Sequence, residues 1–78
     1  RKNTVDINAN FDEICDLYNA KWKSPLDEDQ QDRLVDLIEA GIQWLQKDGF
    51  LPTRLQTLPR PMVMMIYNSL LLDNKSNW

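Results

Sequence analysis

The feature that most constrains this chain is an uncharged, largely apolar stretch at residues 61–72, with the sequence PMVMMIYNSLLL. Wound as a helix, the stretch has one face with the spacing i, i+3, i+4, i+7 of a core-facing stripe, made of Val63, Ile66, Tyr67 and Leu70. The opposite face, where a surface helix normally has charged residues, is made of Met62, Met65, Ser69 and Leu72. Neither face suits water, so the rest of the chain or a partner must cover both.

A strand over residues 62–67 is the alternative to a helix. The three unbranched methionines, the Leu-rich continuation and the proline at the start favour the helix. We expect Arg60 to cap it and Pro61 to occupy its first position.

Two further helices are predicted from apolar stripes and start signals. Together with the uncharged stretch they give helices near residues 10–23, 26–48 and 61–72, and no sheet. A short helical turn is expected within residues 53–58, where Leu55 and Leu58 would reach the core. The predicted fold is all-α: a small three-helix domain of orthogonal or bundle-like arrangement.

The chain is long enough for one domain. At 78 residues it buries only about 60% of its unfolded surface, so a partner is a natural source of extra stability. We expect an N-terminal arm at residues 1–9, a single helical domain at 10–73 and a polar C-terminal tail at 74–78.

The first helix is expected to begin at a capping box formed by Asn10 and Glu13. Pro25 should end it, because proline restricts the residue before it. The side expected to face the core is made of Phe11, Ile14, Cys15, Tyr18 and Trp22.

The second helix is expected to start with either Ser24 or Asp27 as its cap. The acidic residues that follow are explained by the positive end of the helix dipole. They do not fit a calcium loop, because the sixth position is not glycine and the twelfth is Ile38.

The apolar arc of this helix is centred on Leu34, Ile38, Gly41 and Leu45, with Val35, Ile42, Leu37 and Trp44 at its edges. Gly41 costs about 1 kcal/mol relative to alanine, which is tolerable if it lets another helix approach closely. At the end of the helix, Gly49 is expected in a left-handed conformation with Phe50 touching Leu45.

The sequence offers little for catalysis. It contains no histidine and one cysteine, Cys15, which lies on a predicted core stripe among acidic residues that disfavour a thiolate. No glycine-rich phosphate loop and no metal-ligand pattern is present. We therefore expect no enzymatic activity, no cofactor and no metal.

The charge of the chain limits its partners. The formal net charge is −3, whereas nucleic-acid-binding domains are normally basic. The apolar stretch is far shorter than the roughly 20 residues of a membrane span. We expect an intracellular, soluble protein, cytoplasmic or nuclear, with a protein partner or self-association and no membrane contact.

The methionine-rich face leaves two alternatives open: burial inside the domain, or a binding surface of the adaptable kind that methionine favours. If it is a binding surface, the expected interface residues are Met62, Met64, Met65, Leu72, Trp78 and Arg60. The first functional hypothesis is thus a helical interaction or oligomerisation module.

A second hypothesis comes from a resemblance. An acidic lead-in to an apolar helix, Asp27 to Leu45, followed by a proline-initiated apolar helix, Pro59 to Leu72, resembles small helical phage head–tail connector proteins. The likeness covers about half of the chain and implies a structural component of a larger particle, such as a viral or phage adaptor. A nucleic-acid-associated helical domain is the third hypothesis.

Overall fold

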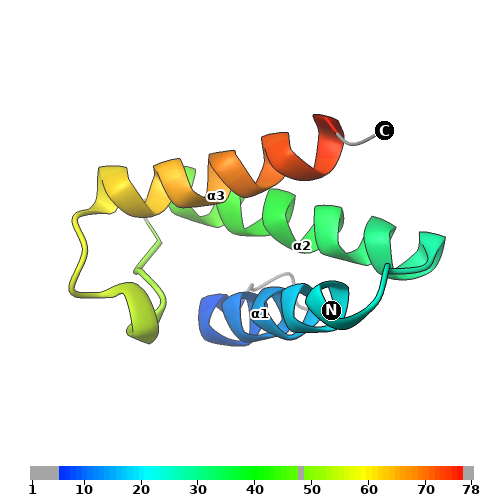
Figure 1. Cartoon of the computed structure of the whole chain (residues 1–78). Helices are drawn as coiled ribbons and strands as arrows, with labels where there is room; N and C mark the ends of the chain where they lie inside the picture. The colour runs from blue at the N-terminus through cyan, green and yellow to red at the C-terminus, as the bar shows by residue number, and fades with distance from the viewer. Residues whose placement is uncertain (1–5, 48, 77–78) are drawn as a thin grey trace, which may run out of the picture.

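The computed structural model describes residues 6–47 and 49–76 of the chain. Its elements are α1 (Ile7–Lys23), α2 (Glu28–Gln46), the 3-10 turn η1 (Thr53–Leu55) and α3 (Arg60–Ser76) (Figure 1). These described residues include no strand, so the strand alternative is wrong. The prediction of an all-α fold of three main helices with a short extra turn is confirmed.

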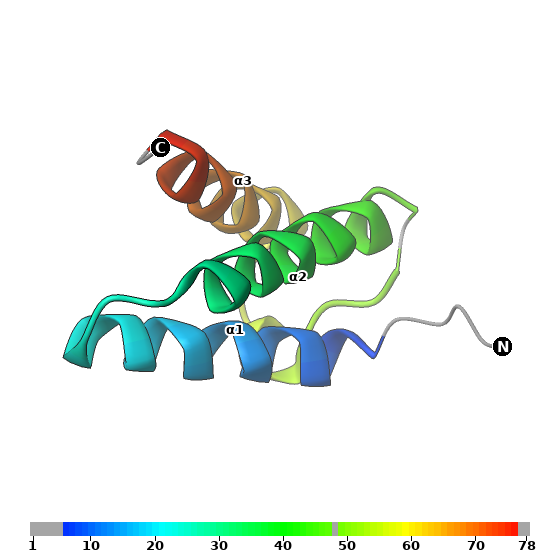
Figure 2. The ribbon, with the colours of Figure 1, turned by 90° about the vertical axis from the view of Figure 1, so that its right-hand side faces the viewer.

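The helix α2 lies between the other two helices and packs against both (Figures 1 and 2). All three contribute to one apolar core, whose buried members are Ile7, Ile14, Leu34, Leu37, Ile38, Ile42, Leu45, Val63 and Tyr67. The α2 arc predicted around Leu34, Ile38, Gly41 and Leu45 is confirmed.

The helix α1 begins three residues earlier than expected. Its N-cap is Asp6, whose side chain accepts hydrogen bonds from the backbone N–H groups of Asn8 and Ala9 at 3.1 and 3.2 Å. The prediction of Asn10 as the cap is wrong, because Ile7 is fully buried and extends the apolar stripe toward the N-terminus. Of the expected arm, residues 1–5 lie outside the described residues.

The buried side of α1 is also rotated from the predicted one. It is centred on Ile7 and Ile14, and the same spacing of seven residues then reaches Lys21 instead of an apolar side chain. Trp22 therefore lies beyond the edge of the stripe and is 91% exposed. The prediction of a core position for Trp22 is wrong. Cys15, also predicted on the core stripe, is only half-buried.

Both ends of α2 are well defined. Asp27, one of the two expected caps, forms a capping box with Gln30. At the other end the Gly49 N–H donates to the Trp44 carbonyl at 3.1 Å, the long bond of a Schellman ending. The backbone of Gly49 is not in the left-handed region, so the prediction of a left-handed Gly49 is wrong. A Cβ at Gly49 would overlap the Trp44 ring, and Phe50 packs edge-on against that ring instead of the expected Leu45.

The helix α3 starts at Arg60, one residue before the predicted start, and continues to Ser76. Arg60 is therefore its first residue and not its cap as predicted. Residues 74–76, which the sequence suggested were part of a tail, are therefore helical. Asn74 is fully buried and has hydrogen-bond partners on two other helices, which explains the extra turn. The predicted tail residues 77–78 lie outside the described residues.

The connection between α2 and α3 folds back against α1. Leu55 and Leu58 are half-buried and pack on the core, as predicted. The Thr53 N–H donates to the Asn8 side chain at 2.6 Å, and Arg54 pairs with Asp12 at 2.9 Å. These contacts fix the chain that leads into α3.

Candidate interaction surface on α3

Figure 1 shows α2 on one side of α3 and no helix on the opposite side. The side chains on that opposite side are largely apolar and exposed. Met62, Met65 and Leu72 are 45%, 67% and 69% exposed, and Ser69 between them is also exposed. We call these four residues the outer face. Their spacing of i, i+3, i+7 and i+10 is the spacing by which one helix presents a seam to another helix. No described residue covers this face. The alternative that the face is fully buried inside the domain is therefore wrong for the described residues.

Of the other residues predicted for the interface, the structure places Met64 and Arg60 away from the outer face. Met64 is half-buried and packs against the core. Arg60 is engaged by backbone carbonyls at the end of α2. Trp78 lies outside the described residues. Ile66, expected on the core face, is half-buried rather than buried.

A close contact with α2 sets which side of α3 faces inward. A Cβ at Gly41 would overlap the ring of Tyr67 and would lie 2.9 Å from Oδ1 of Asn10. The Tyr67 ring thus lies directly against the backbone of α2, where no larger residue than glycine fits. The prediction that Gly41 permits close helix packing is confirmed.

Hydrogen bonds complete this contact. The Tyr67 hydroxyl donates to Oδ1 of Asn10 at 3.0 Å, and Nδ2 of Asn10 donates to the Leu37 carbonyl at 2.8 Å. Burial, with a smaller contribution from Cys15, raises the pKa of Tyr67, so its proton stays on the hydroxyl. The three helices are therefore joined at one point by neutral, fully paired polar groups.

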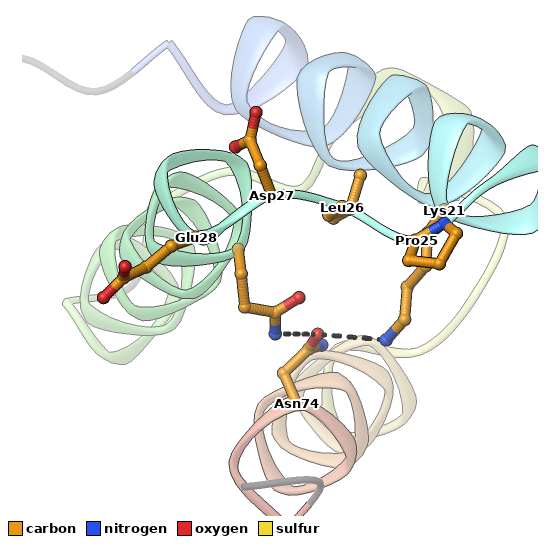
Figure 3. Close-up of a pocket in the computed structure, with 7 residues that line it drawn as sticks. Lys21, Pro25, Leu26, Asp27, Glu28 and Asn74 are labelled. Carbon is orange, nitrogen blue, oxygen red and sulfur yellow. Dashed lines mark hydrogen bonds between the residues drawn. The ribbon is translucent and has the colours of Figure 1, made fainter.

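Asn74 makes a second polar junction at the other end of the bundle (Figure 3). Its Oδ1 accepts from Gln31 at 2.9 Å and from Lys21 at 3.5 Å. Its Nδ2 donates to the Tyr18 hydroxyl at 2.6 Å and to the Leu70 carbonyl at 2.7 Å. One side chain of α3 is thus bound to both α1 and α2.

The junction forms the floor of a pocket of about 370 Å³, lined by Lys21, Pro25, Leu26, Asp27, Glu28, Gln31 and Asn74 (Figure 3). Lys21 and Asn74 point toward each other across it, and Asp27 is occupied as the cap of α2. Lys21, Gln31, Asp27 and Asn74 already have partners within the chain, so the polar floor of the pocket is accounted for by the joining of the helices.

The start of α3 is fixed as firmly as its end. The Arg60 guanidinium donates to the carbonyls of Leu45 and Gly49, at the C-terminus of α2. A cation there also complements the negative end of the α2 dipole. With both ends and the middle of α3 fixed, the outer face is held outward as a preformed surface.

Three acidic residues of α2, Asp32, Asp36 and Glu39, have the spacing of one helical face. Glu39 pairs with Lys75 of α3 at 3.3 Å. Asp32 and Asp36 line a hollow of about 510 Å³ together with Val35 and Lys75. Lys75 is one helical turn beyond Leu72, so the hollow adjoins the C-terminal end of the outer face.

Sequence reasoning missed two of the residues that orient this surface. Asn10 and Asn74 are polar residues that periodicity assigns to a cap and a tail, yet both are buried. A signal was present for Asn10, since it lies three and four residues from Ile7 and Ile14 on one helical face. For Asn74 the signal was its distance of seven residues from Tyr67, which a longer helix would have placed on the same face.

No protein-family model, no curated protein and no solved structure matches this chain. Within residues 6–47 and 49–76, no group of three or more acidic, cysteine or histidine side chains could hold a metal ion. None of the helices in this part of the chain has the length and apolar character needed to cross a membrane.

Proposed function

We propose that this chain is a non-catalytic helical interaction or assembly module that binds a protein partner through the outer face of α3. The observation that supports the proposal is the exposure of Met65 and Leu72, both about two-thirds exposed, in a stretch without charged residues. Exposed apolar surface gains free energy when a partner removes it from water. Methionine adds a flexible contact that adapts to the partner.

The spacing of the outer face favours a helical partner. Met62, Met65, Ser69 and Leu72 alternate steps of three and four residues, which is how a helix meets another helix along a seam. Ser69, the small residue in the middle, allows the partner backbone to approach closely there.

The fixed position of α3 supports binding without a large entropic cost. Tyr67 and Asn74 hold the helix to α1 and α2, so its backbone is already ordered before the partner arrives. Within this chain, the ordering cost falls mainly on the exposed methionine and leucine side chains, about 0.5–1.5 kcal/mol each.

A displayed library of helical peptides, selected on the wild-type chain, tests the proposal. The selected peptides are then measured against Met65→Asp and against Asn19→Asp, which adds the same charge at an exposed position of α1. We expect Met65→Asp to weaken binding at least tenfold, because the carboxylate would be desolvated in the complex. Asn19→Asp should stay within twofold of wild type. Equal affinity for wild type and Met65→Asp would overturn the proposal.

Sedimentation velocity on the same variants separates the forms that the function can take. A dimer that Met65→Asp abolishes indicates self-association through the outer face. A ring-sized assembly indicates a structural component of a larger particle. A monomer that still binds the selected peptides indicates a module for a different protein.

A further inference from the structure

The outer face alone is too small for a stable complex. The 17 residues of α3 span about 25 Å at 1.5 Å per residue, and one face of a helix is about 10 Å wide. The resulting footprint of about 250 Å² is far below the roughly 800 Å² per partner of a specific interface. A partner on the outer face must therefore also contact the surface beside it.

The surface beside it is hollowed and acidic. The hollow of about 510 Å³ is lined by Asp32, Val35 and Asp36 from α2 and by Lys75 from α3, one helical turn beyond Leu72. Asp32 and Asp36 are both exposed. Neither forms an ion pair within 4 Å among the described residues, although Arg33 next to Asp36 in sequence is close enough to interact with it.

The cation that lines the hollow is already neutralised. The Lys75 ammonium lies 3.3 Å from the Glu39 carboxylate, so this pair contributes no net charge. Asp32 and Asp36 add negative charge at the hollow. A partner that lies over this surface gains when it brings positive charge and loses when it brings negative charge.

We infer that the partner segment is a basic amphipathic helix, with apolar residues on the outer face of α3 and lysine or arginine side chains over Asp32 and Asp36. The inference rests on the proposed function of α3 and adds the chemistry of the partner. A second copy of this chain fits less well, because it is itself acidic and would add negative charge beside Asp32 and Asp36. The formal net charge of the chain is −3.

The probe for this inference is a set of three synthetic helical peptides with the same leucine seam. Their flanking positions are all lysine, all glutamine or all glutamate. Binding of each peptide to the whole chain is measured by titration calorimetry at low and high salt. We expect the lysine peptide to bind at least tenfold more tightly than the glutamate peptide at low salt, and the difference to shrink as salt screens the charges.

Single charge removals locate the effect. Asp32→Asn and Asp36→Asn should each weaken the lysine peptide about 2- to 5-fold at low salt. Asp16→Asn removes the same charge from an exposed position of α1 and should leave the affinity within 1.5-fold. Binding of the glutamine peptide should be unchanged in all three variants.

The outcomes separate this inference from the proposed function. If the three peptides bind equally, or if Asp16→Asn weakens binding as much as Asp36→Asn, the inference is overturned while the role of the outer face stands. If the lysine peptide binds Met65→Asp as tightly as wild type, the outer face is not the site, and both are overturned. Failure of the lysine peptide to bind at millimolar concentration also overturns the inference.

Discussion

The two sides of α3 have similar amino-acid types in opposite surroundings. On the inner side Val63 and Tyr67 are fully buried against the other helices, whereas on the outer side Met65 and Leu72 remain mostly exposed. The difference lies in what faces each side. The Tyr67 ring packs on the backbone at Gly41 and its hydroxyl donates to Asn10, while no described residue covers Met65. Shape and hydrogen-bond partners, and not apolar composition alone, therefore decide which side of an apolar helix becomes core.

Opposite responses to the same added charge are the strongest test of this comparison. Val63→Asp would place a carboxylate in the core without a partner, at a cost of about 3–5 kcal/mol. That cost equals the whole stability of about 3–5 kcal/mol expected for a core of this size, so the variant should be unfolded. Met65→Asp should change the free energy of unfolding by at most about 1 kcal/mol.

Circular dichroism and urea unfolding of both variants give the answer. If Met65→Asp loses its helical signal as completely as Val63→Asp, the outer side is core and the comparison fails. If Val63→Asp stays folded, the inner side of α3 is not buried as described.

The next largest effect is expected at Gly41, where the inner side meets α2. Gly41→Ala gains about 1 kcal/mol of helix propensity but brings a methyl group into the Tyr67 ring. We expect overpacking to prevail, with a net loss of about 1–3 kcal/mol in the free energy of unfolding. Gln43→Ala, on the exposed side of the same helix, should change it by less than about 0.5 kcal/mol. A higher melting temperature for Gly41→Ala would contradict the close contact.

The close contact at Gly41 could be predicted from the sequence. In a helix of many turns, the periodicity of apolar residues shows with little ambiguity which face a residue lies on. Leu34, Ile38 and Leu45 identify the inner side of α2, and Gly41 lies among them. The fold class followed from the same kind of pattern, which also separated the methionine side of α3 from its core side but left open whether that side is exposed.

The pattern was insufficient where burial depends on a partner distant in the chain. Asn10 is buried because Tyr67 and Leu37 pair with it, and Asn74 because Tyr18 and Gln31 do. Nothing in the sequence near Asn10 or Asn74 indicates that these distant partners lie next to them in the fold. The stripe on α1 was also misplaced by a fraction of a turn, since its aromatic residues suggested a core side that included Trp22 instead of one centred on Ile7 and Ile14.

An effect of the same size or smaller is expected from removing one hydroxyl on the inner side. Tyr67→Phe keeps the ring over Gly41 but leaves Oδ1 of Asn10 without its donor in a buried site. The free energy of unfolding should fall by about 1–3 kcal/mol, toward the lower end if a water molecule replaces the hydroxyl. Urea unfolding measures the change.

A double variant shows whether the two groups act together. Asn10→Ala combined with Tyr67→Phe removes both members of the hydrogen bond and should cost less than the sum of the single changes. Strict additivity would mean that the bond between them contributes nothing, and the inner side would then be held by packing alone.

The smallest effect is expected at an exposed charged pair, in contrast to the neutral buried groups under α3. The Arg33 guanidinium donates two hydrogen bonds to Glu13, at 2.8 and 2.9 Å, and lowers the pKa of that carboxyl below its ordinary value of 4.5. A carboxyl whose pKa is lower in the folded state stabilises the fold above pH 4.5 and loses that contribution as the pH falls through the folded value. Because the pair is exposed, the contribution should be only about 0.2–1 kcal/mol.

Glu13→Gln should therefore be less stable than wild type by that small amount at neutral pH, and the difference should vanish in acid. The double variant with Arg33→Gln should cost no more than Glu13→Gln alone, since one lost partner already removes the pair. Urea unfolding across the acid range measures both differences. A difference that persists in acid would show that Glu13 acts through packing and not through its charge. The distinction between charged contacts at the surface and neutral ones beneath α3 would then not hold at this site.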